Sequence, residues 1–320
     1  MSELRYDPIR RSWVIIAAER GERPTALVDR SSTNTHGPVE SCPFCPGNED
    51  MTPPEITSIR EPGTAPDSPG WRVRVIPNKF PALERDVLLE RSSRGLYDVI
   101  SGFGTHEIIV ETPRVDQQMD GFSLKHLKDI FIILRNRLEE LKKDKRFQYV
   151  MVFKNYGAQA GCSLFHAHSQ IIAIPVIPNL ISAELASFRE YFRAGRSCLM
   201  CDVIRQEVED DERVVIDSEK FIAFAPYPSS FPFEVRITPK DHSHDFAGTT
   251  DPALGQFARI VRGTLRKLKK VLKDPPYNFV LHTAPPTFER AERPGFWKSL
   301  SEDYHWYLEI IPRTTRIAGF

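Results

Sequence analysis

The chain has 320 residues, and its 43 basic and 43 acidic side chains give a formal net charge of zero. This balance argues against a general nucleic-acid-binding protein, which usually carries a basic excess. No apolar run approaches the roughly 18–20 residues of a membrane-spanning helix, and the first residues lack the apolar core of a signal peptide. We therefore expect a soluble, cytoplasmic protein of two domains that has no nucleic-acid or membrane partner.

Two C-x-x-C pairs are the first motifs along the chain. Cys42 and Cys45 lie in a loop rich in Pro and Gly, and Cys198 and Cys201 follow much later. Disulfides are rare in a reducing compartment, and pairs of this spacing are typical of zinc half-sites that distant histidines complete. A thioredoxin-like redox pair is instead expected between a strand and a helix start. Zinc binding is the favoured interpretation, and a metal-free structural or redox role is the alternative.

The segments after the first pair predict mixed α and β structure. Apolar residues recur at helical spacing from Leu124 to Leu141, and Ser123 suits the N-cap of that helix. The predicted elements are strands at 71–83 and 104–113, a helix at about 123–145, a strand at 149–157, and an apolar strand that begins near 166.

The second half repeats this order of features. Its long helix is predicted at about 252–273, with Asp251 as the cap and Pro252 in the first helical position. Because a C-x-x-C, two strands, one helix and two further strands recur in the same order, we infer an internal duplication. The alternative is two α+β domains that share a common pattern. The remaining predicted strands lie at 214–228, 233–243, 277–285 and 305–312.

The sequence His166-Ala-His168-Ser-Gln170 is the sharpest chemical feature. Residues two apart on a strand face the same side, so both histidines and Gln170 are expected to project into one cavity. The loop at 155–163 contains Gly and Ser and is suited to present backbone N–H groups to phosphate oxygens. A neutral imidazole is a competent nucleophile, and an amide stabilises developing charge. The plain alternative is a pair of half-buried histidines that make ordinary hydrogen bonds.

These motifs together resemble the galactose-1-phosphate uridylyltransferase family of the histidine-triad superfamily. The resembling segments follow the family order over nearly the whole chain, and some details are more similar to the ADP-glucose phosphorylase branch. The segments are ERGERP, CPFCPGNE, VIPNKFPAL, GFGTHEIIVETP, NYGAQAGCSLFHAHSQ, FPFEVRITPKDHS and YHWYLEIIPR.

The resemblance implies an α+β fold of two histidine-triad-like domains, each an antiparallel half-barrel sheet with one long helix. We expect a catalytic domain at 1–181 and a non-catalytic domain at 182–320. The resemblance also implies ping-pong nucleotidyl transfer, in which His168 is the nucleophile and Gln170 assists. The residues that match nucleotide- or phosphate-contacting positions are Arg20, Arg23, Asn78, Asn155, Ser163 and Gln170. Surface charge for the two arginines and turn formation for the two asparagines are the alternatives.

The resemblance further implies two zinc sites, and this sequence departs from one of them. The first site retains Cys42, Cys45 and His166, but Val115 stands where the family has a histidine, and Asp116 or water is the candidate substitute. The second set is complete, and its residues are Cys198, Cys201, His242 and His305, with His244 as a neighbour that can replace His242.

The second half also differs at the position that corresponds to the nucleophile. Tyr307 stands at the place equivalent to His168, which predicts a catalytically silent half. His282 and Glu184 match iron-ligand positions of some relatives, but Tyr307 breaks that set and we predict no iron site.

Three functions remain open on the sequence. The leading one is a UDP-glucose–hexose-1-phosphate (galactose-1-phosphate) uridylyltransferase, which takes UDP-glucose or UDP-galactose and a sugar 1-phosphate. The alternative within the same chemistry is an ADP-glucose phosphorylase with phosphate as acceptor. The alternative of another class is a non-catalytic, zinc-stapled nucleotide-binding scaffold. The resemblance also implies a homodimer.

Overall fold

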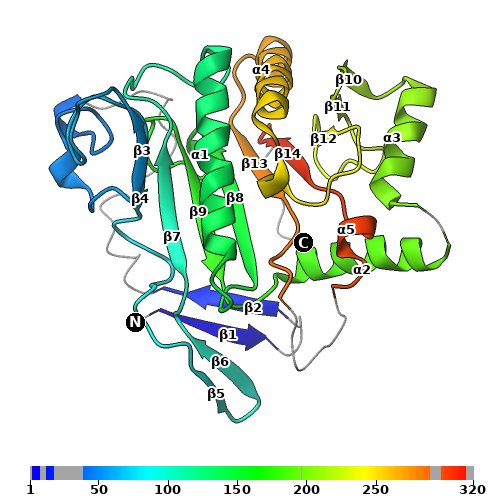
Figure 1. The fold of residues 1–320 in the computed structure, drawn as a ribbon, viewed down its shortest axis with the longest axis horizontal. Helices are drawn as coiled ribbons and strands as arrows, with labels where there is room; N and C mark the ends of the chain where they lie inside the picture. Colours follow the sequence, from blue (N-terminus) through cyan, green and yellow to red (C-terminus); the bar gives the residue numbers. More distant parts are fainter. Residues whose placement is uncertain (1, 8–11, 18–38, 196, 289–296, 315–320) are drawn as a thin grey trace.

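A long antiparallel sheet is the framework of the molecule (Figure 1). The computed structural model describes residues 2–7, 12–17, 39–195, 197–288 and 297–314. The sheet has ten strands in the order β10-β11-β12-β14-β13-β8-β9-β7-β4-β3. Their bounds are β3 Thr57–Arg60, β4 Trp71–Pro77, β7 Thr105–Val110, β8 Tyr149–Tyr156, β9 His168–Ile174, β10 Val214–Asp217, β11 Phe221–Phe224, β12 Val235–Pro239, β13 Tyr277–His282 and β14 Tyr307–Pro312.

The strand order confirms the predicted α+β architecture with two related halves. In each half the strand after the long helix (β8, β13) pairs with the next strand along the chain (β9, β14), which pairs with the strand before the helix (β7, β12). The outer strands β4 and β3 correspond in the same way to β11 and β10. The two five-stranded halves join where β8 pairs with β13.

The two long helices cover one face of this sheet side by side (Figure 1). They are α1, Leu124–Lys142, and α4, Asp251–Leu272. Ser123 caps α1 as predicted, since its side chain accepts from the backbone N–H of His126. The prediction for α4 was wrong by one residue. Thr250 is the cap and Asp251 begins the helix, because the extended backbone of Thr250 lets its hydroxyl accept from the N–H of Ala253.

The core beneath these helices spans both halves. Phe131 of α1 and Phe257 of α4 lie 4.7 Å apart between ring centroids, within one buried cluster. A second cluster on the other face of the sheet packs against three further helices. These are α2 Asn179–Arg193, α3 Leu199–Asp210 and α5 Leu300–Asp303.

A second, four-stranded sheet was not predicted. It has the order β2-β1-β6-β5 and combines the N-terminal strands with a later hairpin. Its strands are β1 Glu3–Asp7, β2 Ser12–Ile16, β5 Arg91–Arg94 and β6 Tyr97–Ser101. None of the helices in the described part of the chain combines the length and the apolarity needed to cross a bilayer.

Candidate active site and metal centres

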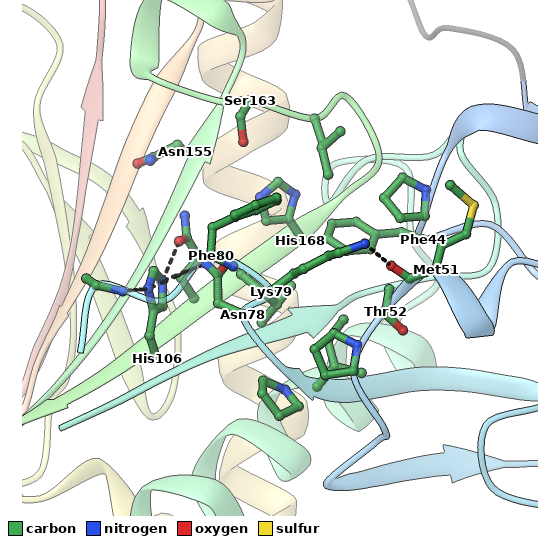
Figure 2. Close-up of a pocket in the computed structure, with 18 of the residues that line it drawn as sticks. Phe44, Met51, Thr52, Asn78, Lys79, Phe80, His106, Asn155, Ser163 and His168 are labelled. Atoms are coloured by element: carbon green, nitrogen blue, oxygen red, sulfur yellow. Dashed lines mark hydrogen bonds between the residues drawn. The ribbon is translucent and has the colours of Figure 1, made fainter. Parts of the chain in front are cut away.

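A cavity of about 510 Å³ opens on the face of the sheet opposite α1 and α4 (Figure 2). Alternation along β9 places it there: Ile171 and Ala173 join the core under the helices, whereas His168, Gln170 and Ile172 line the cavity. The other walls come from β4, β7 and β8 and from the loops that follow Ser41 and Gly161. The volume lies in the range typical of small-molecule sites.

His168 lines the centre of this cavity with its side chain almost fully enclosed. Its Nδ1 lies 2.8 Å from the carbonyl oxygen of His166. A carbonyl only accepts, so Nδ1 carries the proton and Nε2 carries the lone pair. Burial, together with the nearby positive charge of Lys154, lowers the pKa of His168 to about 4. The ring is therefore neutral near pH 7, the state in which imidazole attacks an electrophile.

His166 does not share this cavity, contrary to the prediction. Strand β9 begins only at His168, so the alternation of a strand does not extend back to His166. The ring of His166 instead contacts the thiols of Cys42 and Cys45. Phe44 packs edge-on against both histidines, with its ring centroid 6.1 Å from that of His166 and 5.4 Å from that of His168.

A histidine that the sequence analysis missed orients Gln170. The backbone N–H of Ala82 donates to Nδ1 of His106, at 3.2 Å, so Nε2 of His106 carries the proton. That Nε2 lies 2.9 Å from Oε1 of Gln170 and donates to it. The amide nitrogen of Gln170 is therefore the end of the side chain that is left to donate to a ligand in the cavity. The only signal in the sequence was that His106 alternates with the apolar Ile108 and Val110 along one face of the predicted strand.

Asn78 lies beside this histidine. Its Oδ1 accepts from the backbone N–H of Phe80 at 2.9 Å, which turns its Nδ2 toward the ring of His106. Figure 2 shows Asn78 beside His106. Together with Gln170, which bonds to His106, they form a polar wall of the cavity.

The cavity is lined by Asn155, near the end of β8, and by Ser163, on the loop that follows; that loop offers fewer backbone donors than predicted. Its short 3₁₀ turn, Ala158–Ala160, uses the N–H groups of Ala160, Gly161 and Cys162 for hydrogen bonds within the loop. The structure thus brings Asn78, Asn155, Ser163, His168 and Gln170 together around one cavity. Figure 2 labels the first four of them. Arg20 and Arg23 lie outside the described residues.

The charge of the cavity suits an anion. No carboxylate lines it in the described ranges, and Lys79, which the sequence analysis did not single out, supplies a cation. The ammonium group of Lys79 donates to the carbonyl of Met51 at 3.2 Å, so it bridges two walls of the cavity. Apolar side chains such as Phe44, Ile108 and Phe153 supply the rest of the lining.

A buried ion pair supports the strand that carries His168. Lys154 lies 2.8 Å from Glu111, and both side chains are at most 1% exposed. Lys154 also donates to the carbonyl of His168 at 3.1 Å, and the hydroxyl of Ser169 donates to Glu111. The network therefore ties β7, β8 and β9 together directly behind the nucleophile candidate.

Replacing Lys154 by methionine is expected to destabilise the fold by about 3–5 kcal/mol, because it leaves the carboxylate of Glu111 buried without its cation. Denaturant unfolding of the full chain measures the loss. Lys143→Met removes an exposed lysine that pairs with Glu140, and it should leave the midpoint unchanged. Equal midpoints for Lys154→Met and the wild type would contradict the expectation.

The first cysteine pair forms a three-residue cluster with His166. Nδ1 of His166 lies 3.4 Å from Sγ of Cys42 and 3.6 Å from Sγ of Cys45. Its Nε2 donates to the carbonyl of Thr112 at 2.6 Å, so the lone pair of Nδ1 points between the thiols. Asp116 is not part of this cluster and pairs with Arg114 at 2.9 Å.

The second cysteine pair forms a cluster of four with two histidines. His242 and His305 each place Nδ1 3.5 Å from Sγ of Cys201, and the ligand atoms of all four residues, with Cys198, lie within 4.8 Å of one another. Nε2 of His305 donates to the carbonyl of Pro239 and Nε2 of His242 to that of Ser301. His244 is not part of the cluster.

Both clusters fit a metal ion by the chemistry of their donors. Two thiols converge on imidazole nitrogens that carry lone pairs, and each imidazole is held by a hydrogen bond from its other nitrogen, as in protein metal sites. Four such donors make a closed set, and three leave one coordination position open.

The counterpart of this site in the second half has different chemistry. Tyr307 begins β14 as His168 begins β9, and its ring stacks on His282 with centroids 4.3 Å apart. Burial, with the negative charge of Glu184, raises the pKa of Tyr307, so it stays protonated. Burial opposes the charged form of His282, but the hydrogen bond to Glu184 and the nearby carboxylate of Glu309 raise its pKa to about 9.

Comparison with known proteins decides the family. The model for the N-terminal domain of galactose-1-phosphate uridyl transferase matches residues 1–178, and the model for the C-terminal domain matches residues 184–313. The chain belongs to the galactose-1-phosphate uridyl transferase family. This confirms the resemblance seen in the sequence and makes the chain a nucleotidyltransferase.

Two curated members of the family are similar over nearly the full chain. ADP-glucose phosphorylase of Arabidopsis thaliana is 34% identical over 99% of this chain and 86% of its own length. Galactose-1-phosphate uridylyltransferase of Thermotoga maritima is 27% identical over 98% of this chain and 87% of its own length.

The solved structures of the family give the same answer for the fold. The Arabidopsis thaliana ADP-glucose phosphorylase with bound ADP-glucose superposes with a TM-score of 0.74 at 32% identity, covering 100% of this chain and 92% of that one. A uridylyltransferase structure superposes with a TM-score of 0.75 at 31% identity, covering 97% and 86%.

Proposed function

We propose that this protein transfers a nucleotidyl group from a nucleotide sugar in two steps through His168. In the first step Nε2 of His168 attacks the α-phosphorus, a phosphorus–nitrogen bond forms, and the bond to the sugar 1-phosphate breaks. In the second step a phosphate-bearing acceptor attacks the same phosphorus and releases the imidazole. A sugar phosphate is a good leaving group, so the chemistry relies on positioning and on charge stabilisation.

The geometry of His168 is the observation that carries the proposal. Its Nδ1 is held by the carbonyl of His166, which leaves the Nε2 lone pair on a ring that lines a cavity of about 510 Å³. That cavity has a lysine and no carboxylate among its described lining residues, as a nucleotide requires.

The cavity suggests roles for the other residues. The amide nitrogen of Gln170, oriented by His106, is suited to donate to an oxygen of the α-phosphate as charge develops. Asn78, Asn155 and Ser163 are suited to contact the nucleotide or its phosphates. The family resemblance adds Arg20 and Arg23. All of these lie in residues 1–181, which we propose as the catalytic domain, and we propose 182–320 as a domain without a nucleophile.

We also propose that the two cysteine–histidine clusters hold zinc as structural sites. The ion would fasten Cys42, Cys45 and His166 beside the catalytic strand, and Cys198, Cys201, His242 and His305 in the second half. Neither cluster lines the cavity beside His168 with its ligand atoms, so we assign no reaction step to the metal.

The leading substrate pair is UDP-glucose or UDP-galactose with a hexose 1-phosphate, which corresponds to a galactose-1-phosphate uridylyltransferase. ADP-glucose with phosphate as acceptor is the second candidate, because the Arabidopsis thaliana enzyme of that activity is 34% identical. The resemblance also implies a homodimer.

The identity of the nucleotide is tested by incubating the full chain separately with UDP-glucose and ADP-glucose, each labelled in the α-phosphate. The labelled protein is then divided between galactose 1-phosphate and inorganic phosphate. Label from UDP-glucose that only galactose 1-phosphate removes supports the first candidate, and label from ADP-glucose that phosphate removes supports the second. A protein that takes no label from either nucleotide sugar contradicts the proposed chemistry.

A further inference from the structure

The seam between the two halves lies directly against the cavity loop. Strands β8 and β13 pair there, with Asn155 opposite Asn278. The next residue but one, Gly157, has φ of +79°, and a Cβ at this position would lie 2.9 Å from the side chain of Pro276. The loop that carries Gly161 and Ser163 into the cavity therefore packs on the second half, although no side chain of that half lines the described cavity.

The side chain of Asn278 makes hydrogen bonds to this loop, to Asn155 and to Arg313, the residue that follows β14. Its Nδ2 donates to the carbonyl of Ala160 at 2.8 Å and to Oδ1 of Asn155 at 2.7 Å. Its Oδ1 accepts from Nε of Arg313 at 2.5 Å. A carbonyl only accepts and a guanidinium only donates, so these two neighbours fix which end of the Asn278 amide is which.

The fixed amide of Asn278 determines the orientation of Asn155. Because Nδ2 of Asn278 donates, the group of Asn155 that faces it is Oδ1. The Nδ2 of Asn155 then lies on the other side, 3.8 Å from the place where a Cβ of Gly161 would stand. Asn155 and Gly161 both line the cavity, so Asn155 presents a nitrogen donor there (Figure 2).

We propose that Asn278, held by Arg313, is a positioning residue for nucleotidyl transfer that aims the amide nitrogen of Asn155 at a phosphate in the cavity. The second half, which has no nucleophile, thereby acts on the chemistry of the first. This inference rests on the proposed function, since a donor at Asn155 serves only a ligand with acceptor oxygens.

The test is the single-turnover rate at which His168 takes label from the nucleotide sugar that labels the wild type. Asn278→Ala is expected to lower this rate roughly 10- to 100-fold, as misplacement of a binding group does. The matched control is Tyr156→Phe, which removes a hydrogen bond to Asp274 across the same seam, 2.9 Å long, without touching the cavity. Its labelling rate should equal that of the wild type.

The variant Asn278→Asp tests whether Asn278 acts by orienting the amide of Asn155 or by stabilising the fold. Aspartate keeps an acceptor for Arg313 but loses the donor to the carbonyl of Ala160, so the melting temperature of each variant is measured and the labelling rates are compared where both are folded. Aspartate also sets an acceptor against Oδ1 of Asn155, which turns that oxygen toward the phosphate. We therefore expect Asn278→Asp to label more slowly than Asn278→Ala. A purely structural role leaves the two folded variants with equal labelling rates and overturns the inference.

The double variant Asn155→Ala with Asn278→Asp tests whether the effect passes through Asn155. It should label at the rate of Asn155→Ala alone. A further slowing, by the factor that Asn278→Asp causes in the wild type, overturns the inference. Absence of label in the wild type overturns the proposed function and this inference with it. Labelling that both Asn278 variants leave at the wild-type rate overturns this inference alone.

Discussion

Replacement of His168 by asparagine is expected to abolish covalent labelling by a nucleotide sugar and to lower turnover by at least about 10⁴-fold, as removal of a nucleophile does. Asparagine is the sharpest choice because its amide nitrogen stands near the place of Nδ1 and keeps a donor for the carbonyl of His166. The change therefore removes the attacking nitrogen and retains the local hydrogen bond.

The label itself identifies the bond. A phosphorus–nitrogen bond to imidazole is labile in acid and stable in base, whereas a phosphate ester on a hydroxyl is stable in acid. The wild type should therefore lose its label on brief acid treatment. His244→Asn, at a histidine that lines a separate cavity beside α1, is the matched control and should label like the wild type. Acid-labile label on His168→Asn would assign the nucleophile to another histidine.

Much of the fold around the candidate site was predicted from the sequence, because helical spacing and the short motif from His166 to Gln170 are local patterns. Helical spacing located α1 and α4 to within a few residues, and the ligand sets that the family resemblance implied for the two C-x-x-C pairs, with His166, His242 and His305, do converge. The short motif from His166 to Gln170 also placed His168 and Gln170 on one face of a strand. His166 departs because the strand begins two residues later than the alternation assumed.

The features that the sequence analysis missed depend on contacts between distant segments. His106 is recognisable as a site residue only once β7 lies beside β9 and its ring reaches Gln170, 64 residues away. The pairing of β8 with β13, which brings Asn278 to Asn155, follows from how two repeated units associate and leaves no periodic signal. The sequence analysis named Asp251 as the cap of α4 although Thr250 is the cap, because Thr and Asp are both good N-cap residues and stand next to each other here.

The two metal clusters are expected to differ in how firmly they hold zinc. The second cluster offers four protein donors and the first offers three, and a closed set of four is the usual structural site. We therefore expect about one tightly bound zinc per chain by elemental analysis after dialysis against a chelator. Cys198→Ser should remove it and lower Tm by about 5–10 °C, which corresponds to roughly 3 kcal/mol. Cys42→Ser should leave that tightly bound zinc in place.

Val115 is the position at which a substitution is expected to complete the first metal cluster. The resemblance to the family implies a histidine at this position, three residues after Thr112, whose carbonyl already holds Nε2 of His166. Val115→His is therefore expected to complete the first cluster and to raise the chelator-resistant zinc to about two per chain. Cys42→Ser in that background should return the content to about one. Two resistant zincs in the unaltered protein would mean that another donor already fills the open position, and that three protein ligands do not describe the first site.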